Sequence, residues 1–107
     1  MVKVAIWIGW RSPEIQAAVI ARAVGLALFS GDPATSDRYL DKIADLIGHF
    51  ERNPLLGTRS VKVPSCRYFP ISSPAPGNPD TLIYNYDEAA KTLVGEGTYP
   101  FLPPIYK

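Results

Sequence analysis

Cysteine and histidine are nearly missing from this chain of 107 residues, which contains one of each. The single cysteine, Cys66, excludes an intrachain disulfide and every metal site that needs several cysteines. We interpret Cys66 as an ordinary strand residue of a protein from a reducing compartment, and we expect a cytoplasmic location. His49 stands near the end of a predicted helix, where we interpret it as a surface residue that offsets the helix dipole rather than as a catalyst.

A large excess of charge of either sign is also lacking. The 11 basic and 10 acidic residues leave a net charge of +1, so nucleic-acid binding would need a local basic patch. The sequence contains no phosphate-binding glycine loop, no metal-ligand spacing and no nucleophile-base signature. We therefore expect neither a metal site nor a small-molecule cofactor.

Long hydrophobic runs are the third scarce feature. The apolar run at residues 4–8 is interrupted by Gly9 too early for a signal peptide. The later run at residues 17–29 contains Arg22 and falls short of the roughly 20 apolar residues that a membrane span requires. We expect no targeting segment, no transmembrane segment and no membrane partner.

Enough hydrophobic residues are present, at 47% of the chain, to build one core. Two cores could not be filled at this length, so we expect residues 1–107 to form a single domain. Residues 2–10 are short, apolar and rich in β-prone side chains, which predicts a strand in or beside a sheet.

Two helices are predicted to follow this strand. Ser12 is a capping residue ahead of a predicted helix over residues 13–29, which stops at a Ser-Gly step. A second helix is predicted over residues 33–52, with Asp32 as its cap or Thr35 and Ser36 as alternatives, and an Asn-Pro step ends it. Together the two helices predict an α-hairpin.

The second half of the chain changes to the period of two that is typical of strands. Strands are predicted at residues 59–63, 66–71, 81–86 and 91–94, with a short piece at 97–99. A hairpin turn is predicted at residues 87–90, a proline-rich loop at 72–80 and an extended proline-rich tail at 100–107. The predicted class is therefore α+β: a short N-terminal strand, an α-hairpin, then an antiparallel meander sheet packed on the helices.

One window of the chain carries a local basic charge. Residues 52–67 contain four cations and no acid, namely Arg52, Arg59, Lys62 and Arg67. They indicate either a binding patch or a solvated sheet edge that basic side chains protect from association. Tyr84 and Tyr86 must share one face of their strand, where they either stack on nucleic-acid bases or pack against the helices.

Three segments resemble the RelE/ParE toxins of bacterial toxin-antitoxin systems. Residues 37–57 are similar to the second helix of that family, which ends in a charged residue, an Asn-Pro or Phe-Pro step and a short apolar exit to a glycine. Residues 59–68 are similar to its basic strand, and residues 82–87 resemble the strand before its hairpin turn. The resemblance covers about residues 37–99.

This resemblance implies a toxin component that acts on translation, by ribosome-dependent mRNA cleavage, or on a protein target such as gyrase. Lys62 and Arg67 match the basic-strand positions and Tyr99 matches a terminal tyrosine, so these three are the candidate catalytic residues. Arg52, Arg59, Tyr84 and Tyr86 are the candidate RNA-binding or partner-binding residues. The implied partners are an antitoxin protein, or a second copy of the chain, and the ribosome with its mRNA.

One departure leaves the enzyme question open. Thr81 stands where the family has an arginine, and losing that cation weakens the stabilisation of phosphate charge in a cleavage reaction. The alternative is a non-enzymatic homodimeric binding module, or an inhibitor of another protein. It is favoured by the first predicted helix, whose only charges are Glu14 and Arg22 and which needs cover on more than one side.

Overall fold

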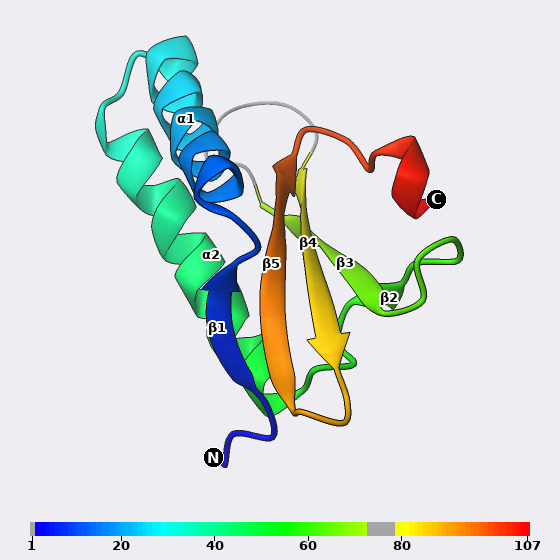
Figure 1. Cartoon of the computed structure of the whole chain (residues 1–107). Helices are drawn as coiled ribbons and strands as arrows, with labels where there is room; N and C mark the ends of the chain where they lie inside the picture. Colours follow the sequence, from blue (N-terminus) through cyan, green and yellow to red (C-terminus); the bar gives the residue numbers. More distant parts are fainter. Residues whose placement is uncertain (1, 73–78) are drawn as a thin grey trace.

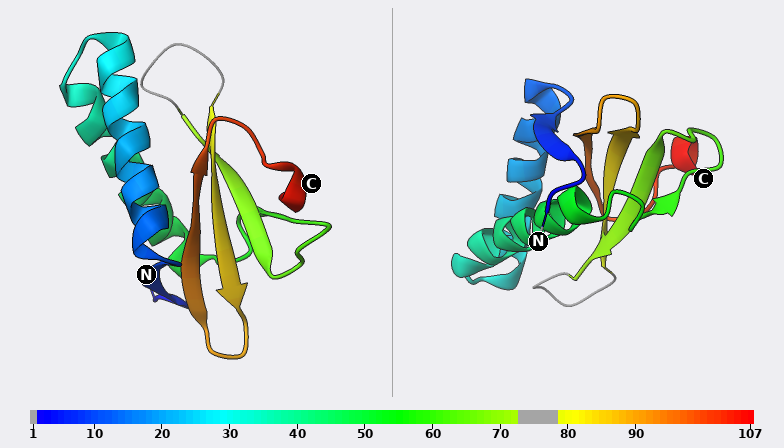
Figure 2. Two further views of the ribbon diagram at one scale, coloured as in Figure 1. Left: turned by 45° about the horizontal axis from the view of Figure 1, so that its top comes forward. Right: turned by 90° about the horizontal axis from the view of Figure 1, so that it is seen from below.

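The computed structural model describes residues 2–72 and 79–107, and it confirms the α+β class (Figure 1). The elements are β1 (Ile6–Trp10), α1 (Pro13–Ser30), α2 (Ala34–Arg52), β2 (Thr58–Arg59), β3 (Cys66–Ile71), β4 (Asp80–Asp87), β5 (Thr92–Tyr99) and a 3-10 turn, η1 (Pro104–Tyr106). The two helices form a hairpin that packs on one side of the sheet, whereas the C-terminal tail lies on the other side, beside the connection between β2 and β3 (Figure 2).

The sheet has five strands in the order β1-β5-β4-β3-β2. Neighbours from β5 to β2 are antiparallel, as predicted, but β1 pairs with β5 in parallel. The predicted antiparallel meander is therefore confirmed, and the N-terminal strand, whose partner the sequence did not specify, joins it in parallel and makes the sheet mixed. A parallel neighbour needs a long connection, which the α-hairpin and the meander supply between β1 and β5.

Local capping signals set the helix ends. The Ser12 hydroxyl accepts a hydrogen bond from the Ile15 amide at 3.2 Å, and α1 ends at Gly31 with a φ of 73°. At the start of α2, Asp32 accepts from the amide of Ala34 at 3.0 Å. Thr35, predicted as an alternative cap, instead lies buried inside α2.

The core lies between the hairpin and the sheet. Its centre is the ring of Phe50 in α2, which stacks on Tyr84 in β4 with ring centroids 4.2 Å apart. Helix α1 contributes the buried residues Val19, Ala23 and Leu26.

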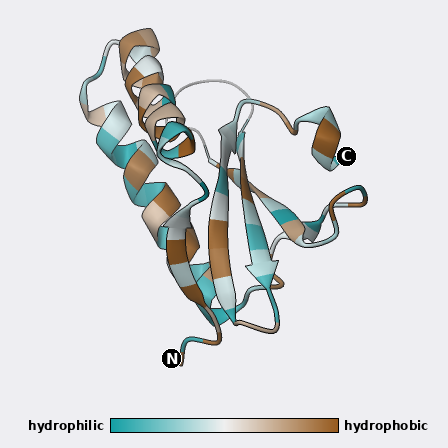
Figure 3. Ribbon diagram, viewed as in Figure 1, coloured by the Kyte–Doolittle hydropathy of each residue, from teal (hydrophilic) through white to brown (hydrophobic). Residues whose placement is uncertain are grey.

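By its length and apolar composition, α1 is also a candidate for a membrane span. Core helices of soluble proteins meet the same criteria of length and composition. Most of α1 is apolar, as its brown and tan ribbon shows (Figure 3).

Three predicted segments differ from the structure. The predicted strand over residues 59–63 is wrong beyond Arg59, because the Ser60 hydroxyl accepts from the Val63 amide at 3.1 Å and turns the chain. The two predicted pieces at the end of the meander form one strand, β5, with a register shift where Gly95 and Gly97 face consecutive residues of β4. The predicted extended tail contains η1, and residues 73–78 of the predicted proline-rich loop lie outside the described residues.

Candidate functional site

Two arginines face each other across strands β2 and β3. The antiparallel register places Arg59 directly opposite Arg67, and Arg67 is in turn opposite Tyr84 of β4. Residues directly opposite share a face of the sheet, and Tyr84 points toward the helices, so both arginines lie on the helix side. Two like charges at such a position destabilise a sheet unless an anion or another acceptor compensates them.

The Arg67 side chain is held by the segment that leaves α2. Its guanidinium donates to the Gly57 carbonyl at 2.8 Å and to the Leu55 carbonyl at 3.4 Å. The Tyr84 hydroxyl fixes the same segment, because it accepts from the Gly57 amide at 2.9 Å and donates to the Pro54 carbonyl at 2.8 Å. Burial raises the pKa of this phenol, so it stays a neutral donor at physiological pH.

Gly57 is required for this contact. A Cβ at that position would lie 2.8 Å from the Tyr84 hydroxyl oxygen and 3.0 Å from the Tyr68 carbonyl oxygen. The glycine after the apolar residues at the end of α2 therefore lets the backbone approach Tyr84 of β4 closely. This contact fixes the start of β2, and with it the position of Arg59.

A cavity of about 300 Å³ opens beside the two arginines. We call it the arginine pocket; its lining residues are Leu55, Arg59, Pro64, Ser65, Arg67, Tyr86 and Glu88. None of the ion pairs between described residues includes Arg59 or Arg67. Glu88, from the turn before β5, adds one carboxylate, so the pocket combines two cations, one acid, a phenol and a hydroxyl. Such a lining suits an anionic group that also accepts or donates hydrogen bonds.

The other two candidate catalytic residues lie elsewhere. Lys62 is in the loop after β2, and its ammonium donates to the carbonyl of Pro104 in the tail at 3.3 Å. Tyr99 pairs with Thr81 at the end of β5, on the face opposite the helices, and its hydroxyl donates to the Glu96 carbonyl at 3.1 Å. The structure therefore brings Arg59, Arg67 and Tyr86 together but separates Lys62 and Tyr99 from them.

The remaining candidate residues also divide. Tyr84 is fully buried in the core, whereas Tyr86, on the same face, is half-buried and reaches the arginine pocket. The prediction that the two tyrosines are either both in the core or both exposed is therefore wrong: Tyr84 lies in the core, and Tyr86 lies at its margin beside the arginine pocket. Arg52 lies at the end of α2, where its guanidinium is 3.2 Å from Nδ1 of His49.

Sequence reasoning missed a polar cluster on the face opposite the helices. Arg11 forms a two-pronged ion pair with Glu96, the shorter contact being 2.7 Å. Tyr106 lies nearby, and its pKa is raised by burial and by the Glu96 carboxylate. Burial likewise raises the pKa of Cys66, which is 2% exposed and does not act as a reactive thiolate. No sequence signal connects Arg11 with a partner so far along the chain.

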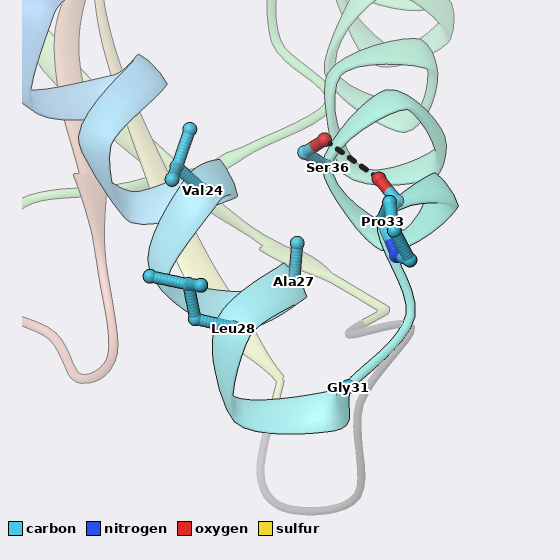
Figure 4. A pocket seen from close by; sticks show the side chains of 6 residues that line it. All are labelled: Val24, Ala27, Leu28, Gly31, Pro33 and Ser36. Carbon is cyan, nitrogen blue, oxygen red and sulfur yellow. Dashed lines mark hydrogen bonds between the residues drawn. The ribbon is translucent and has the colours of Figure 1, made fainter.

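A second cavity, of about 370 Å³, lies at the tip of the hairpin (Figure 4). Its lining residues are Val24, Ala27, Leu28, Gly31, Pro33 and Ser36. The Ser36 hydroxyl donates to the Pro33 carbonyl at 3.1 Å, and none of the lining residues is charged. Within residues 2–72 and 79–107, no three His, Cys, Asp or Glu side chains are grouped to hold a metal ion.

Searches against protein-family models, curated proteins and solved structures found no match for this chain. The candidate site is therefore defined by its own geometry, with the arginine pocket as the group of predicted residues that the fold assembles.

Proposed function

We propose that this chain is a cytoplasmic, RelE/ParE-like toxin component that binds an anionic group of its target in the arginine pocket. The observation that best supports this proposal is the Arg59–Arg67 pair, two cations directly opposite each other on adjacent strands. An incoming phosphate or carboxylate would relieve their repulsion, and Arg67 is already oriented by the carbonyls of Leu55 and Gly57.

The arrangement favours blocking a target over cleaving RNA. Cleavage at a ribose 2′-hydroxyl needs a base, cations and an acid around one phosphate. Here Lys62 and Tyr99 are bonded to other carbonyls, away from the arginine pocket, and Thr81 stands in place of an arginine. Occupation of a protein target such as gyrase, or of the ribosome, needs only the binding surface.

Growth after tightly controlled induction in bacteria tests this proposal. We expect wild-type protein to arrest growth and Arg59→Ala to relieve the arrest at least tenfold in colony counts. Arg59 is the better probe because Arg67 also holds the exit segment of α2. Lys42→Ala, which removes an exposed cation of α2, is the matched control and should leave the arrest intact.

The Lys62→Ala/Tyr99→Phe variant separates the two modes of action. Arrest that persists in this variant supports blocking, whereas arrest that it relieves, while Arg59→Ala does not, would replace blocking by cleavage. Unaffected growth with abundant soluble wild-type protein would contradict the toxin proposal. It would favour the second candidate, a non-enzymatic homodimeric binding or inhibitor module, to which the exposed apolar side chains of α1 point.

A further inference from the structure

The outer face of α1 is apolar although it is exposed. Its large side chains are 48% exposed at Ile20 and Val24, 79% at Leu28 and 78% at Phe29. The smaller exposed residues between positions 17 and 29 are Ala17, Ala18, Ala21 and Gly25. Among the exposed residues from 16 to 29 only Gln16 is polar, and none is charged.

The two charges of α1 do not modify this face. Glu14 lies in the first turn, before the face begins. Arg22 is turned inward, where its guanidinium makes two hydrogen bonds of 2.8 Å to the Asp80 carboxylate. A helix that faces water normally presents charged or polar residues there, so this face is built to be covered.

We propose that the outer face of α1 binds the same face of a second copy of this chain, with the two helices antiparallel. In a twofold dimer one surface patch meets itself, so any charge on it would approach its own copy. The outer face of α1 avoids that repulsion because it carries no charge. This proposal does not depend on the arginine pocket, which lies on other elements.

The order of side chains along the face selects the antiparallel arrangement. Ala17, Ala21, Val24 and Leu28 follow the helical repeat and form the midline of the face. An antiparallel partner places its Leu28 opposite Ala17 and its Val24 opposite Ala21, so each large side chain meets a small one. A parallel partner would put leucine against leucine and alanine against alanine, leaving gaps between the helices.

The available area fits a reversible dimer. The four large side chains alone expose on the order of 500 Å² per protomer, against roughly 800 Å² per partner in a standard interface. Val24 and Leu28 also line the cavity at the hairpin tip, so the apolar surface continues toward the start of α2 (Figure 4). We expect a dissociation constant on the order of micromolar.

A membrane surface is a poorer match for this face. Helices that lie on anionic lipid carry lysines and arginines beside their apolar face, and α1 has only Arg22, which is paired with Asp80. The full chain should therefore not float with vesicles of phosphatidylcholine and phosphatidylglycerol. Flotation by a protein that stays monomeric in solution would overturn the proposal.

Sedimentation of the full chain from about 0.1 to 100 μM, which extends at least a decade either side of the expected dissociation constant, is the main test. Val24→Asp/Leu28→Asp should raise the dissociation constant by about a hundredfold or more, because it buries four carboxylates in the dimer. Both side chains are exposed, so the thermal midpoint of the monomer should hardly change. Val61→Asp, at an 84% exposed position in the loop after β2, is the matched control and should still dimerise.

Cross-linking tests the direction of the helices. Cys66 is 2% exposed and will not compete with an introduced thiol. A mixture of Ala17→Cys and Leu28→Cys proteins should form the mixed disulfide dimer, whereas either protein alone should not. In the antiparallel arrangement two copies of residue 28 are about 16 Å apart along the helix, at 1.5 Å per residue. A monomer at every concentration, an unaffected aspartate variant or self-linking by either single variant would each overturn the proposal.

Discussion

At the scale of single residues, Glu51 shows how one side chain can complete a sheet edge. Its carboxylate accepts from the Trp7 amide at 3.0 Å and pairs with Lys3 at 3.2 Å, and its carbonyl accepts from Val4 and Ala5. The Trp7 hydrogen bond, followed by the pairing with Lys3, lowers the pKa of this carboxyl below its usual value. The Glu51 carboxylate therefore stabilises the fold at pH values above the usual pKa of a glutamate. This contribution is lost as the pH falls through the lowered pKa of the folded state.

We predict that Glu51→Gln is less stable than wild type by about 1 kcal/mol at pH 7, since it keeps an acceptor for Trp7 but loses the charge. The difference should shrink as pH is lowered from 7 toward 2, because the wild-type carboxyl becomes protonated. Urea unfolding at several pH values measures it. Glu88→Gln, in an exposed turn, is the control and should change stability by less than about 0.5 kcal/mol at pH 7. A difference that stays constant down to pH 2 would contradict the role given to Glu51.

At the scale of elements, the hairpin is attached to the sheet by a buried polar group. Asp80, which begins β4, is 1% exposed and accepts two hydrogen bonds from Arg22 of α1. It also accepts from the Tyr39 hydroxyl of α2 at 2.7 Å, and burial, more than this bond, raises the pKa of that phenol. One carboxylate thus joins three elements that are distant in the sequence.

Removing one partner from this group should be far more damaging than breaking a similar pair at the surface. We predict that Arg22→Ala lowers the free energy of unfolding by about 3 kcal/mol, because Asp80 is left buried without its cation. Arg11→Ala is the matched control: its pair with Glu96 has the same two-pronged geometry, but the Arg11 side chain is 50% exposed. It should lose about 1 kcal/mol or less. Thermal or urea unfolding of the two variants measures both losses of free energy. If the two losses are similar, solvent screens both ion pairs alike and the prediction is wrong.

Most elements could be predicted because their signals are local. Ser12 and Gly31 delimit α1, and β-prone, aromatic side chains mark the segments that form β3 and β4. The parallel pairing of β1 with β5 could not be predicted, since nothing in either strand specifies a partner more than 80 residues away. The candidate site was predictable only in part: the basic window marked Arg59 and Arg67. Where β2 ends, and hence where Lys62 lies, depends on the Ser60 hydroxyl.

At the scale of the whole molecule, the near balance of charge limits how the chain can bind a polyanion. A net charge of +1 adds little long-range attraction, so binding of single-stranded RNA would depend on the few cations of the arginine pocket. Each phosphate contact changes the salt dependence of the affinity by about 0.7 in the slope of log K against log salt.

If RNA is the target, we predict a slope of about −1.4, from the two contacts that Arg59 and Arg67 can make. Arg59→Ala should reduce its magnitude by about 0.7, whereas Lys42→Ala, remote on α2, should leave it unchanged. Fluorescence anisotropy with a short single-stranded RNA at several salt concentrations measures both quantities. A slope steeper than about −3 would require cations outside the arginine pocket. Absence of binding at low salt would exclude direct RNA contact and leave an acidic protein surface as the ligand of the two arginines.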